Sequence, residues 1–136
     1  MIRVYDQIFT EEDAQAALGV MRSGQLSAGP VTLKLEDTFA KYAGRKYAIT
    51  CNNGTAALYI ALRALNIQNC RVAIPSCSYI ASAVAASMLQ NRISFIDAEL
   101  ETWNLDLNKL QDECIISRKN GDPIKEVLIQ RFKSDD

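Results

Sequence analysis

The chain contains no histidine, and this absence excludes several kinds of site before any motif is considered. Catalysis by a Ser-His-Asp or Cys-His arrangement needs an imidazole as the general base. The four cysteines, Cys51, Cys70, Cys77 and Cys114, form no C-x-x-C pair, so a zinc site is not expected either. Because Cys51, Cys77 and Cys114 lie in or beside apolar runs, we expect buried free thiols in a reducing cytoplasm.

The chain also lacks an excess of charge of one sign and a long apolar run. Its 15 basic and 16 acidic residues give a net charge of -1, which offers no electrostatic footprint for nucleic acid or an anionic membrane. Residues 1–6 show no apolar core of a signal peptide, and the longest weakly polar stretch, residues 79–89, is far shorter than a bilayer span. We therefore expect a cytoplasmic protein that binds neither nucleic acid nor membrane.

The remaining composition is that of an ordinary folded protein. Hydrophobic residues make up 49% of the chain and charged residues 23%, which argues against wholesale disorder. A length of 136 residues suffices for one hydrophobic core and is too short for two. We expect a single domain over residues 1–136.

Two helices are predicted at the start of the chain. Thr10 is a suitable N-cap for the first helix because three acidic residues follow it, and Gly24 is a suitable end. After a loop over residues 25–30, Pro30 stands where a second helix would begin, and Gly44 would stop it. One apolar face of the second helix is predicted from the spacing of Leu35, Phe39 and Tyr42.

From residue 46 onward, short apolar runs alternate with helical patterns. The predicted strands cover residues 47–51, 71–75, 93–97 and 126–130, and the predicted helices cover residues 55–65, 79–89 and 107–115. In the first of these helices the inward side chains are predicted to be Leu58, Ala61, Leu62 and Leu65. The pattern predicts an α/β protein: two leading helices, then a mainly parallel β-α-β-α-β-α-β arrangement covered by helices.

A candidate phosphate-binding motif follows the first predicted strand. Residues 52–58 (NNGTAAL) place Gly54 and Thr55 at the start of a helix. A glycine lets a phosphate approach the backbone closely, and the free N–H groups and positive dipole end of the helix favour its negative charge. The alternative is that Gly54 and Thr55 only turn the chain and cap an ordinary helix.

A second candidate motif follows the next predicted strand. Residues 75–79 (PSCSY) lie at the carboxyl end of that strand, where ligands bind in open α/β sheets. Tyr79 would then place its ring over a planar heteroaromatic ligand held at the first loop. The alternative for Tyr79 is a half-buried aromatic side chain at a helix start.

Together these motifs resemble the DegT/DnrJ/EryC1/StrS family of pyridoxal 5'-phosphate (PLP)-dependent sugar aminotransferases. The resemblance covers about residues 7–130, with the motifs in order. It is carried by residues 26–30 (LSAGP), 35–36 (LE), 39–44 (FAKYAG), 53–58 (NGTAAL), 75–76 (PS) with Tyr79, 95–97 (FID) and 103–106 (WNLD). The last two segments match stretches that we interpret as structural.

The resemblance implies the N-terminal part of the large domain of a fold-type-I PLP-dependent transferase, with PLP as cofactor. Family members are usually homodimers that transfer an amino group from glutamate to a nucleotide-linked keto-sugar. By this resemblance Gly54, Thr55 and Ala56 would bind the cofactor phosphate and Tyr79 would cover its ring. A further, weaker implication is substrate binding by Ser27 and Gly29, with a plain helix-entry loop as the alternative.

The resemblance also shows which catalytic groups are missing. Transamination needs a Schiff-base lysine and an aspartate that keeps the pyridine nitrogen protonated, and the family carries both beyond the end of this sequence. Asp97 matches a strand-end position and does not replace that aspartate. The seven lysines match no such context, and we expect all of them to be solvated: Lys34, Lys41, Lys46, Lys109, Lys119, Lys125 and Lys133.

The sequence leaves the family pattern after Gln130, where a charged segment replaces the expected apolar one. We interpret this departure as a truncated or frame-disrupted reading frame. Three functional hypotheses follow: an inactive aminotransferase fragment without a catalytic residue, one half of a split aminotransferase, or a non-catalytic phosphate- or nucleotide-binding α/β module.

Overall fold

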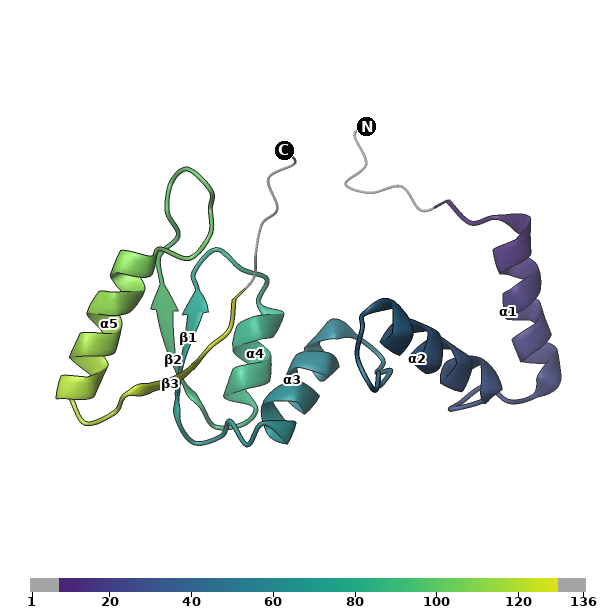
Figure 1. Cartoon of the computed structure of the whole chain (residues 1–136), viewed down its shortest axis with the longest axis horizontal. Coiled ribbons are helices and arrows are strands. Elements are labelled where there is room, and N and C mark those ends of the chain that lie inside the picture. The colour runs from purple at the N-terminus through teal and green to yellow at the C-terminus, as the bar shows by residue number, and fades with distance from the viewer. Residues whose placement is uncertain (1–7, 130–136) are drawn as a thin grey trace. The chain divides into compact units, whose positions relative to one another are not determined.

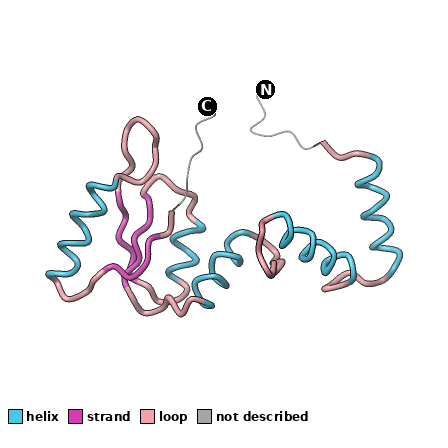
Figure 2. Tube along the Cα trace, in the orientation of Figure 1, coloured by secondary structure: helices cyan, strands magenta, loops and turns pink. Residues whose placement is uncertain are grey.

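The computed structural model describes residues 8–129, and these form two compact units. The first unit ends at Thr50 and contains two helices, whereas the second begins at Cys51 and contains three helices and three strands within the described range. Figure 1 shows the elements in chain order, and Figure 2 shows the same chain coloured by secondary structure. Between residues 8 and 129 no helix is long and apolar enough to cross a membrane.

Helix α1 (Glu11–Ser23) begins and ends where the sequence predicts. The Thr10 hydroxyl oxygen accepts a hydrogen bond from the Asp13 N–H, and the Asp13 carboxylate accepts one from the Thr10 N–H at 2.9 Å. This reciprocal pair is a capping box, which satisfies two backbone donors at the helix start. Gly24 ends the helix with φ of 73°, a left-handed conformation that glycine adopts without strain.

Helix α2 (Pro30–Tyr42) also begins as predicted, with Pro30 in the first turn after the N-cap Gly29. Gly44 follows its end with φ of 62°. The apolar side chains predicted to share one face, Leu35, Phe39 and Tyr42, are all more than half exposed. Phe39 and Tyr42 form a ring pair whose centroids lie 6.2 Å apart.

The strand predicted over residues 47–51 is wrong. This segment is irregular, and Tyr47 and Ile49 are largely exposed. A strand needs a neighbouring strand to pair its backbone groups, and no described strand pairs with these residues. Instead, the Thr50 N–H and hydroxyl both donate hydrogen bonds of 2.8 Å to Oε1 of Glu36 on α2, which also lowers the pKa of the Glu36 carboxyl.

The second unit alternates helices with parallel strands. Its elements are α3 (Gly54–Ala64), β1 (Arg71–Pro75), α4 (Ala81–Ser87), β2 (Arg92–Ile96), α5 (Leu107–Lys119) and β3 (Ile124–Val127). The three strands form one sheet in the order β2-β1-β3, and β1 is parallel to both of its neighbours. The predicted α/β class and parallel sheet are therefore confirmed, with three strands in the described chain in place of four.

Three predicted elements have wrong ends: α5, which ends at Lys119 and not at residue 115, and α4 and β3. Helix α4 is shorter than the predicted 79–89, because Gln90 takes the left-handed φ of 58° and the chain turns before it. Strand β3 begins two residues earlier than predicted and ends at Val127. Beyond that point the Leu128 N–H still donates to the Ala73 carbonyl at 2.9 Å, and Gln130 lies outside the described residues.

Each face of the sheet is covered by its own hydrophobic cluster. On one face Val72 and Ile74 of β1 pack with residues of α3 and α4, and on the other Ala73 of β1 and Ile96 of β2 pack with α5. Figure 1 shows α5 on one side of the sheet and α4 on the other. This alternation along β1 follows from the two-residue period of a strand, and it makes β1 the buried centre of the unit.

The inward face of α3 differs from the predicted one. Leu62 is 2% exposed and Leu58 is partly buried, as predicted, but Ala61 and Leu65 are exposed. Tyr59 is partly buried against the same cluster. Compared with the prediction, the helix is therefore rotated about its axis, so that positions 58, 59 and 62 face α4 and the sheet. The packing of α3 against α4 decides this orientation.

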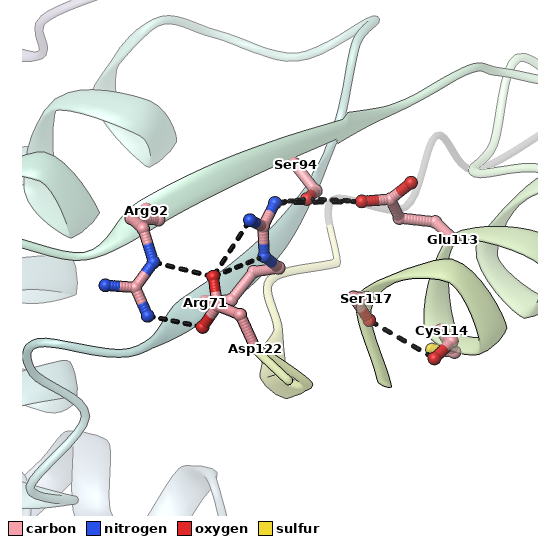
Figure 3. A network of polar contacts seen from close by, with 7 residues as sticks. All are labelled: Arg71, Arg92, Ser94, Glu113, Cys114, Ser117 and Asp122. Carbon is pink, nitrogen blue, oxygen red and sulfur yellow. Dashed lines mark hydrogen bonds and ion pairs between the residues drawn. The ribbon is translucent and has the colours of Figure 1, made fainter. Parts of the chain in front are cut away.

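A network of charged side chains joins the amino ends of the strands (Figure 3). Asp122, in the turn before β3, accepts hydrogen bonds from Arg71 Nε at 2.9 Å and from Arg92 Nε at 2.7 Å. Arg71 Nη1 also donates to Ser94 Oγ at 2.9 Å, and that hydroxyl donates to Glu113 on α5 at 2.8 Å. The hydrogen bond from Arg92 lowers the pKa of the Asp122 carboxyl, and partial burial raises it. The hydrogen bond has the larger effect, and the pKa of Asp122 is lowered to about 2.

Candidate functional site

A pocket of about 600 Å³ lies in the second unit, between the start of α3 and the loop after β1. Gly54, Thr55 and Leu58 line it from α3, Tyr79 and Ser82 from the segment after β1, and Ile129 from the residues after β3. The segments carrying Tyr79 and Ile129 leave the carboxyl ends of two adjacent parallel strands, which is where ligands bind in open α/β sheets. The volume is within the range of small-molecule sites.

Two predicted cofactor-binding residues, Gly54 and Thr55, contribute backbone donors to this pocket. They are the first two residues of α3, where the N–H groups have no partner within the helix. Neither N–H has an acceptor among the described residues. These unpaired donors and the positive end of the helix dipole lie at the same place, and both favour an anion at the start of α3.

Ala56, the third predicted phosphate contact, is placed differently. Its N–H donates a hydrogen bond of 2.9 Å to Oδ1 of Asn53, the N-cap of α3, and Ala56 does not line the pocket. The N-cap of α3 is therefore Asn53, and the choice between phosphate binding and an ordinary helix start at Gly54 and Thr55 stays open. The amide of Ala56 is already paired within the chain.

The surroundings of Gly54 do not explain why this residue is a glycine. Its backbone is outside the left-handed region, and a Cβ added there would meet no atom within 4 Å. The fold itself would therefore accept a larger residue. A glycine in open space at a helix start suits the close approach of a ligand to the backbone, which a Cβ would obstruct.

Tyr79 lines the same pocket from the segment between β1 and α4. It follows β1 by four residues, just before α4, and 72% of it is exposed. The alternative of a half-buried aromatic at a helix start is therefore wrong. An exposed ring beside free backbone donors can stack on a planar ligand whose anionic group is held at Gly54 and Thr55.

Ser27 and Gly29, the predicted substrate contacts, lie in the first unit, in the loop between α1 and α2. Gly29 lines a separate pocket of about 510 Å³ between α1 and α2. A Cβ on Gly29 would lie 3.3 Å from the Gln25 carbonyl oxygen. A side chain at this position would thus be tight against the Gln25 carbonyl, and substrate binding by Ser27 and Gly29 stays a prediction.

No described lysine or carboxylate lines the Gly54–Tyr79 pocket, where Tyr79 is the only ionisable side chain. Six of the seven lysines are exposed, as predicted, and Lys133 lies outside the described residues. Lys41 forms an ion pair of 2.6 Å with Asp37, and Lys46 lies 5.1 Å from the centre of the Tyr47 ring. The described part of the pocket therefore offers backbone donors, hydroxyls and an aromatic ring to a ligand.

The cysteines take no part in the pocket lining. All four are free, as predicted, but Cys51 is exposed and Cys70, Cys77 and Cys114 are only half-buried, so the predicted burial is wrong. The apolar neighbours of Cys51 belong to a segment that forms no strand and is not covered. Partial burial raises the pKa of the Cys70 thiol. Within residues 8–129 no group of His, Cys, Asp or Glu is arranged to hold a metal ion.

The sequence reasoning missed Asn53, Ser82 and Ile129 as lining residues. Asn53 was detectable, because an asparagine directly before a helix start is a favoured N-cap. Ser82 lies three residues after Tyr79, on the first turn of α4, and joins the pocket only because that helix packs against α3. Ile129 reaches it through the parallel pairing of β3 with β1, which no local pattern indicates.

Comparisons with known proteins agree on one family. A family model described as the DegT/DnrJ/EryC1/StrS aminotransferase family matches residues 7–120. The chain belongs to this family. It is 38% identical over 93 residues to the UDP-2-acetamido-2-deoxy-3-oxo-D-glucuronate aminotransferase of Pseudomonas aeruginosa, a match that covers 68% of this chain and 26% of that protein.

A second curated relative is the GDP-perosamine synthase of Caulobacter vibrioides, which is 42% identical over 86 residues, covering 62% of this chain and 23% of that protein. The chain thus spans about a quarter of the length of these relatives. Among solved structures, a Streptococcus pneumoniae protein named as a sugar aminotransferase, in its PLP form, superposes with a TM-score of 0.73 at 26% identity. That match covers 77% of this chain and 27% of the other. The fold is therefore that of PLP-dependent sugar aminotransferases.

Proposed function

We propose that this chain carries the phosphate- and ring-binding part of a PLP-dependent aminotransferase that acts on nucleotide-linked keto-sugars. The observation that supports this most directly is the pocket in which the free N–H groups of Gly54 and Thr55 lie together with the exposed ring of Tyr79. An anion site beside an aromatic ring matches the two parts of PLP, a phosphate ester and a planar pyridine ring.

The residues present fit this cofactor. The N–H groups of Gly54 and Thr55 and the hydroxyl of Thr55 would hold the phosphate, and the Tyr79 ring would cover the pyridine. The open space at the Gly54 Cβ position allows the phosphate to approach the backbone. When bound, PLP supplies an electron sink for negative charge that develops beside a transferred amino group. This chain contributes binding and orientation.

We also propose that the chain by itself does not transaminate. The pocket lining includes no lysine amine and no carboxylate in the described residues, and the six described lysines are exposed. Covalent attachment of the cofactor and control of its ring nitrogen need those two groups. In this proposal the two compact units are parts of one transferase large domain, and the rest of the machinery is supplied by residues outside this sequence.

The proposed substrate class rests on the relatives. The names of the two curated relatives refer to a UDP-linked keto-sugar acid and to a GDP-linked amino sugar. Both matches cover most of this chain. We therefore propose a nucleotide-linked keto-sugar as amino acceptor, glutamate as amino donor, a homodimer as the assembled enzyme and the cytoplasm as its location.

Cofactor binding is tested by titrating the 136-residue chain with PLP and following the cofactor absorbance and tyrosine fluorescence. The Thr55→Val variant removes one hydroxyl donor to the phosphate, so its affinity should fall by roughly tenfold to a hundredfold, the size of a hydrogen bond to a charged group. Thr38→Val, at an exposed position of α2, is the matched control and should bind as the unchanged chain does.

Two further arms separate the alternatives. Gel filtration should remove all PLP from the chain, and incubation with glutamate should give no 2-oxoglutarate; retained cofactor or turnover would contradict the proposed inactivity. If uridine or guanosine diphosphate binds at the Thr55-dependent site more tightly than PLP, the chain is instead a nucleotide-binding module. Absence of any phosphate-dependent binding would reject the proposed cofactor site.

A further inference from the structure

Asn53 is the residue that decides which backbone donors at the start of α3 remain open. Its Oδ1 accepts the Ala56 N–H at 2.9 Å, and its main-chain carbonyl accepts the Ala57 N–H at 3.1 Å. The Cys51 thiol also donates to the same carbonyl at 3.5 Å. Two of the first four N–H groups of the helix are thus paired with Asn53, and those of Gly54 and Thr55 are left for a ligand.

The chemical type of this cap differs from that of the other long helix in the same unit. Helix α5 is capped by Asp106, whose Oδ1 accepts from the N–H groups of Asn108 and Lys109 at 2.8 and 3.2 Å. Aspartate and asparagine cap helices about equally well, and a carboxylate gains additionally from the helix dipole. At α3, which lines the pocket, the cap is the neutral amide.

A neutral cap has two consequences for an anion in the pocket. It leaves the positive end of the α3 dipole uncompensated, whereas a carboxylate would cancel part of it and repel a phosphate. It also keeps two N–H donors on Nδ2, because the hydrogen bond to Ala56 uses only Oδ1. The Nδ2 group has no acceptor among the described residues, and Asn53 lines the pocket.

We propose that Asn53 is a positioning residue for the phosphate of the bound ligand. It withholds the Ala56 N–H, directs the phosphate to the N–H groups of Gly54 and Thr55, and keeps the cap uncharged so that the anion is not repelled. This inference rests on the proposed function, because it concerns the phosphate of the cofactor proposed for this pocket. It assigns to Asn53 a role that is separate from stabilising the helix.

The deciding variant is Asn53→Asp in the full 136-residue chain. The carboxylate still caps α3, so the melting temperature should be unchanged or higher. A phosphate monoester carries a charge of roughly -1.5 to -2 at neutral pH, and one added negative charge beside it should weaken PLP binding at least about tenfold at low salt. The loss should shrink as salt is added, because screening reduces the repulsion.

Two control variants isolate the charge. Asn53→Ser keeps a neutral cap, so its PLP affinity should stay well above that of Asn53→Asp. Asn108→Asp makes the same chemical change in the first turn of α5, away from the pocket lining, and should bind PLP as the unchanged chain does. Equal PLP affinity of the unchanged chain and Asn53→Asp at low salt would overturn the inference.

A residue-level measurement needs no variant at all. In two-dimensional ¹⁵N–¹H spectra, addition of PLP or inorganic phosphate should move the amide signals of Gly54 and Thr55 more than that of Ala56. A largest shift at Ala56 would show that the phosphate displaces the Asn53 side chain, which overturns the assignment. This arm also decides the question if the Asn53→Asp variant does not fold.

Failure of this inference is distinguishable from failure of the proposed function. If the unchanged chain binds PLP through Thr55 but the Asn53 variants and the Ala56 signal contradict the assignment, only the role of Asn53 falls. If the unchanged chain binds neither PLP nor phosphate, the cofactor site itself is rejected, and the role of Asn53 is rejected with it.

Discussion

Arg71 at the start of β1 and Asp122 in the turn before β3 are joined by two contacts, from Nε at 2.9 Å and from Nη2 at 2.8 Å, to the same carboxylate oxygen. Arg92 at the start of β2 binds the same carboxylate. One aspartate therefore connects the amino ends of all three strands, at the edge of the sheet opposite the strand ends that lead into the pocket. The network thus joins the three strands at the end of the sheet away from the Gly54–Tyr79 pocket.

Asp122→Asn should lower the melting temperature at neutral pH, because the neutral amide binds two guanidinium groups less strongly than a carboxylate. The pKa of Asp122 is lowered from 3.8 to about 2 by Arg92 first and also by Arg71. A folded-state pKa below the unfolded value means that the stabilisation is complete above about pH 4 and is lost as the pH falls toward 2. Thermal melts from pH 7 to 2 measure this effect.

The variant should therefore show a smaller drop in melting temperature between pH 5 and 2 than the unchanged chain does. Asp112→Asn is the matched control, because Asp112 is at an exposed position of α5 and its carboxylate accepts no hydrogen bond from the described residues. Its acid profile should follow that of the unchanged chain. Parallel profiles for Asp122→Asn and the unchanged chain would show that the network does not contribute.

Leu62 and Leu65 provide a test of how α3 is packed. Leu62 is 2% exposed between α4 and the sheet, so Leu62→Ala should lower the free energy of unfolding by about 2 to 5 kcal/mol, the usual cost of a buried leucine cavity. Leu65 is 66% exposed, so Leu65→Ala should change the free energy of unfolding by about 0.5 kcal/mol or less. Chemical denaturation measures both, and equal losses would contradict the rotated face.

The sequence predicted the fold where local chemistry decides the structure. Thr10, Gly24 and Pro30 each act at a helix end through their own side chain or backbone, so helices α1 and α2 were found with nearly correct ends. The strand predicted over residues 71–75 was likewise found with its predicted bounds, as β1.

The errors occurred where a partner distant in sequence decides the structure. Residues 47–51 have strand-like composition, yet the Thr50 N–H bonds to the Glu36 side chain and no described strand pairs with the segment. In the same way, the packing of α3 on α4 exposes Leu65 and buries Tyr59, which the helical period alone does not reveal. Tertiary contacts overrode local preference in both cases.

The candidate site was half predictable. Gly54, Thr55 and Tyr79 were identified from loop chemistry and from their strand-end positions, and the structure brings all three to one pocket. Ala56 was assigned to the phosphate by the family resemblance, and the sequence does not show that the Asn53 side chain accepts its N–H. Sequence separation also hid Ile129, which lies 50 residues beyond Tyr79 and reaches the pocket through sheet pairing.

The Gly54→Ala variant tests whether position 54 requires glycine for folding or for binding a ligand. Because the Cβ would meet no atom within 4 Å, the variant should keep the melting temperature of the unchanged chain or raise it slightly. The added methyl group would stand where the proposed phosphate approaches, so PLP affinity should fall by about tenfold or more through the loss of one charge-assisted hydrogen bond. Calorimetric titration and thermal melts measure the two effects.

Gly19→Ala is the matched control for this substitution. Gly19 lies inside α1, and a Cβ there would also meet no atom within 4 Å. Alanine should stabilise that helix by roughly 0.5 to 1 kcal/mol and leave PLP binding unchanged. If Gly54→Ala binds PLP as tightly as Gly19→Ala does, the glycine serves no ligand at this position.

Tyr79 allows the ring contribution to be separated from that of the hydroxyl. Tyr79→Phe keeps an aromatic face at the pocket edge, whereas Tyr79→Ala removes it. If the ring stacks on the pyridine, Tyr79→Phe should bind PLP within about threefold of the unchanged chain, and Tyr79→Ala should lose roughly 0.5 to 1.5 kcal/mol, which is about twofold to twelvefold in affinity.

The choice of ligand sharpens this last test. Inorganic phosphate has no ring, so Tyr79→Ala should bind phosphate as the unchanged chain does while losing affinity for PLP. Since the ring is 72% exposed, its removal should leave the melting temperature nearly unchanged, and a change in binding would then report the ligand contact directly. Equal losses for phosphate and PLP would place the role of Tyr79 in the shape of the loop, and stacking on the cofactor would have to be abandoned.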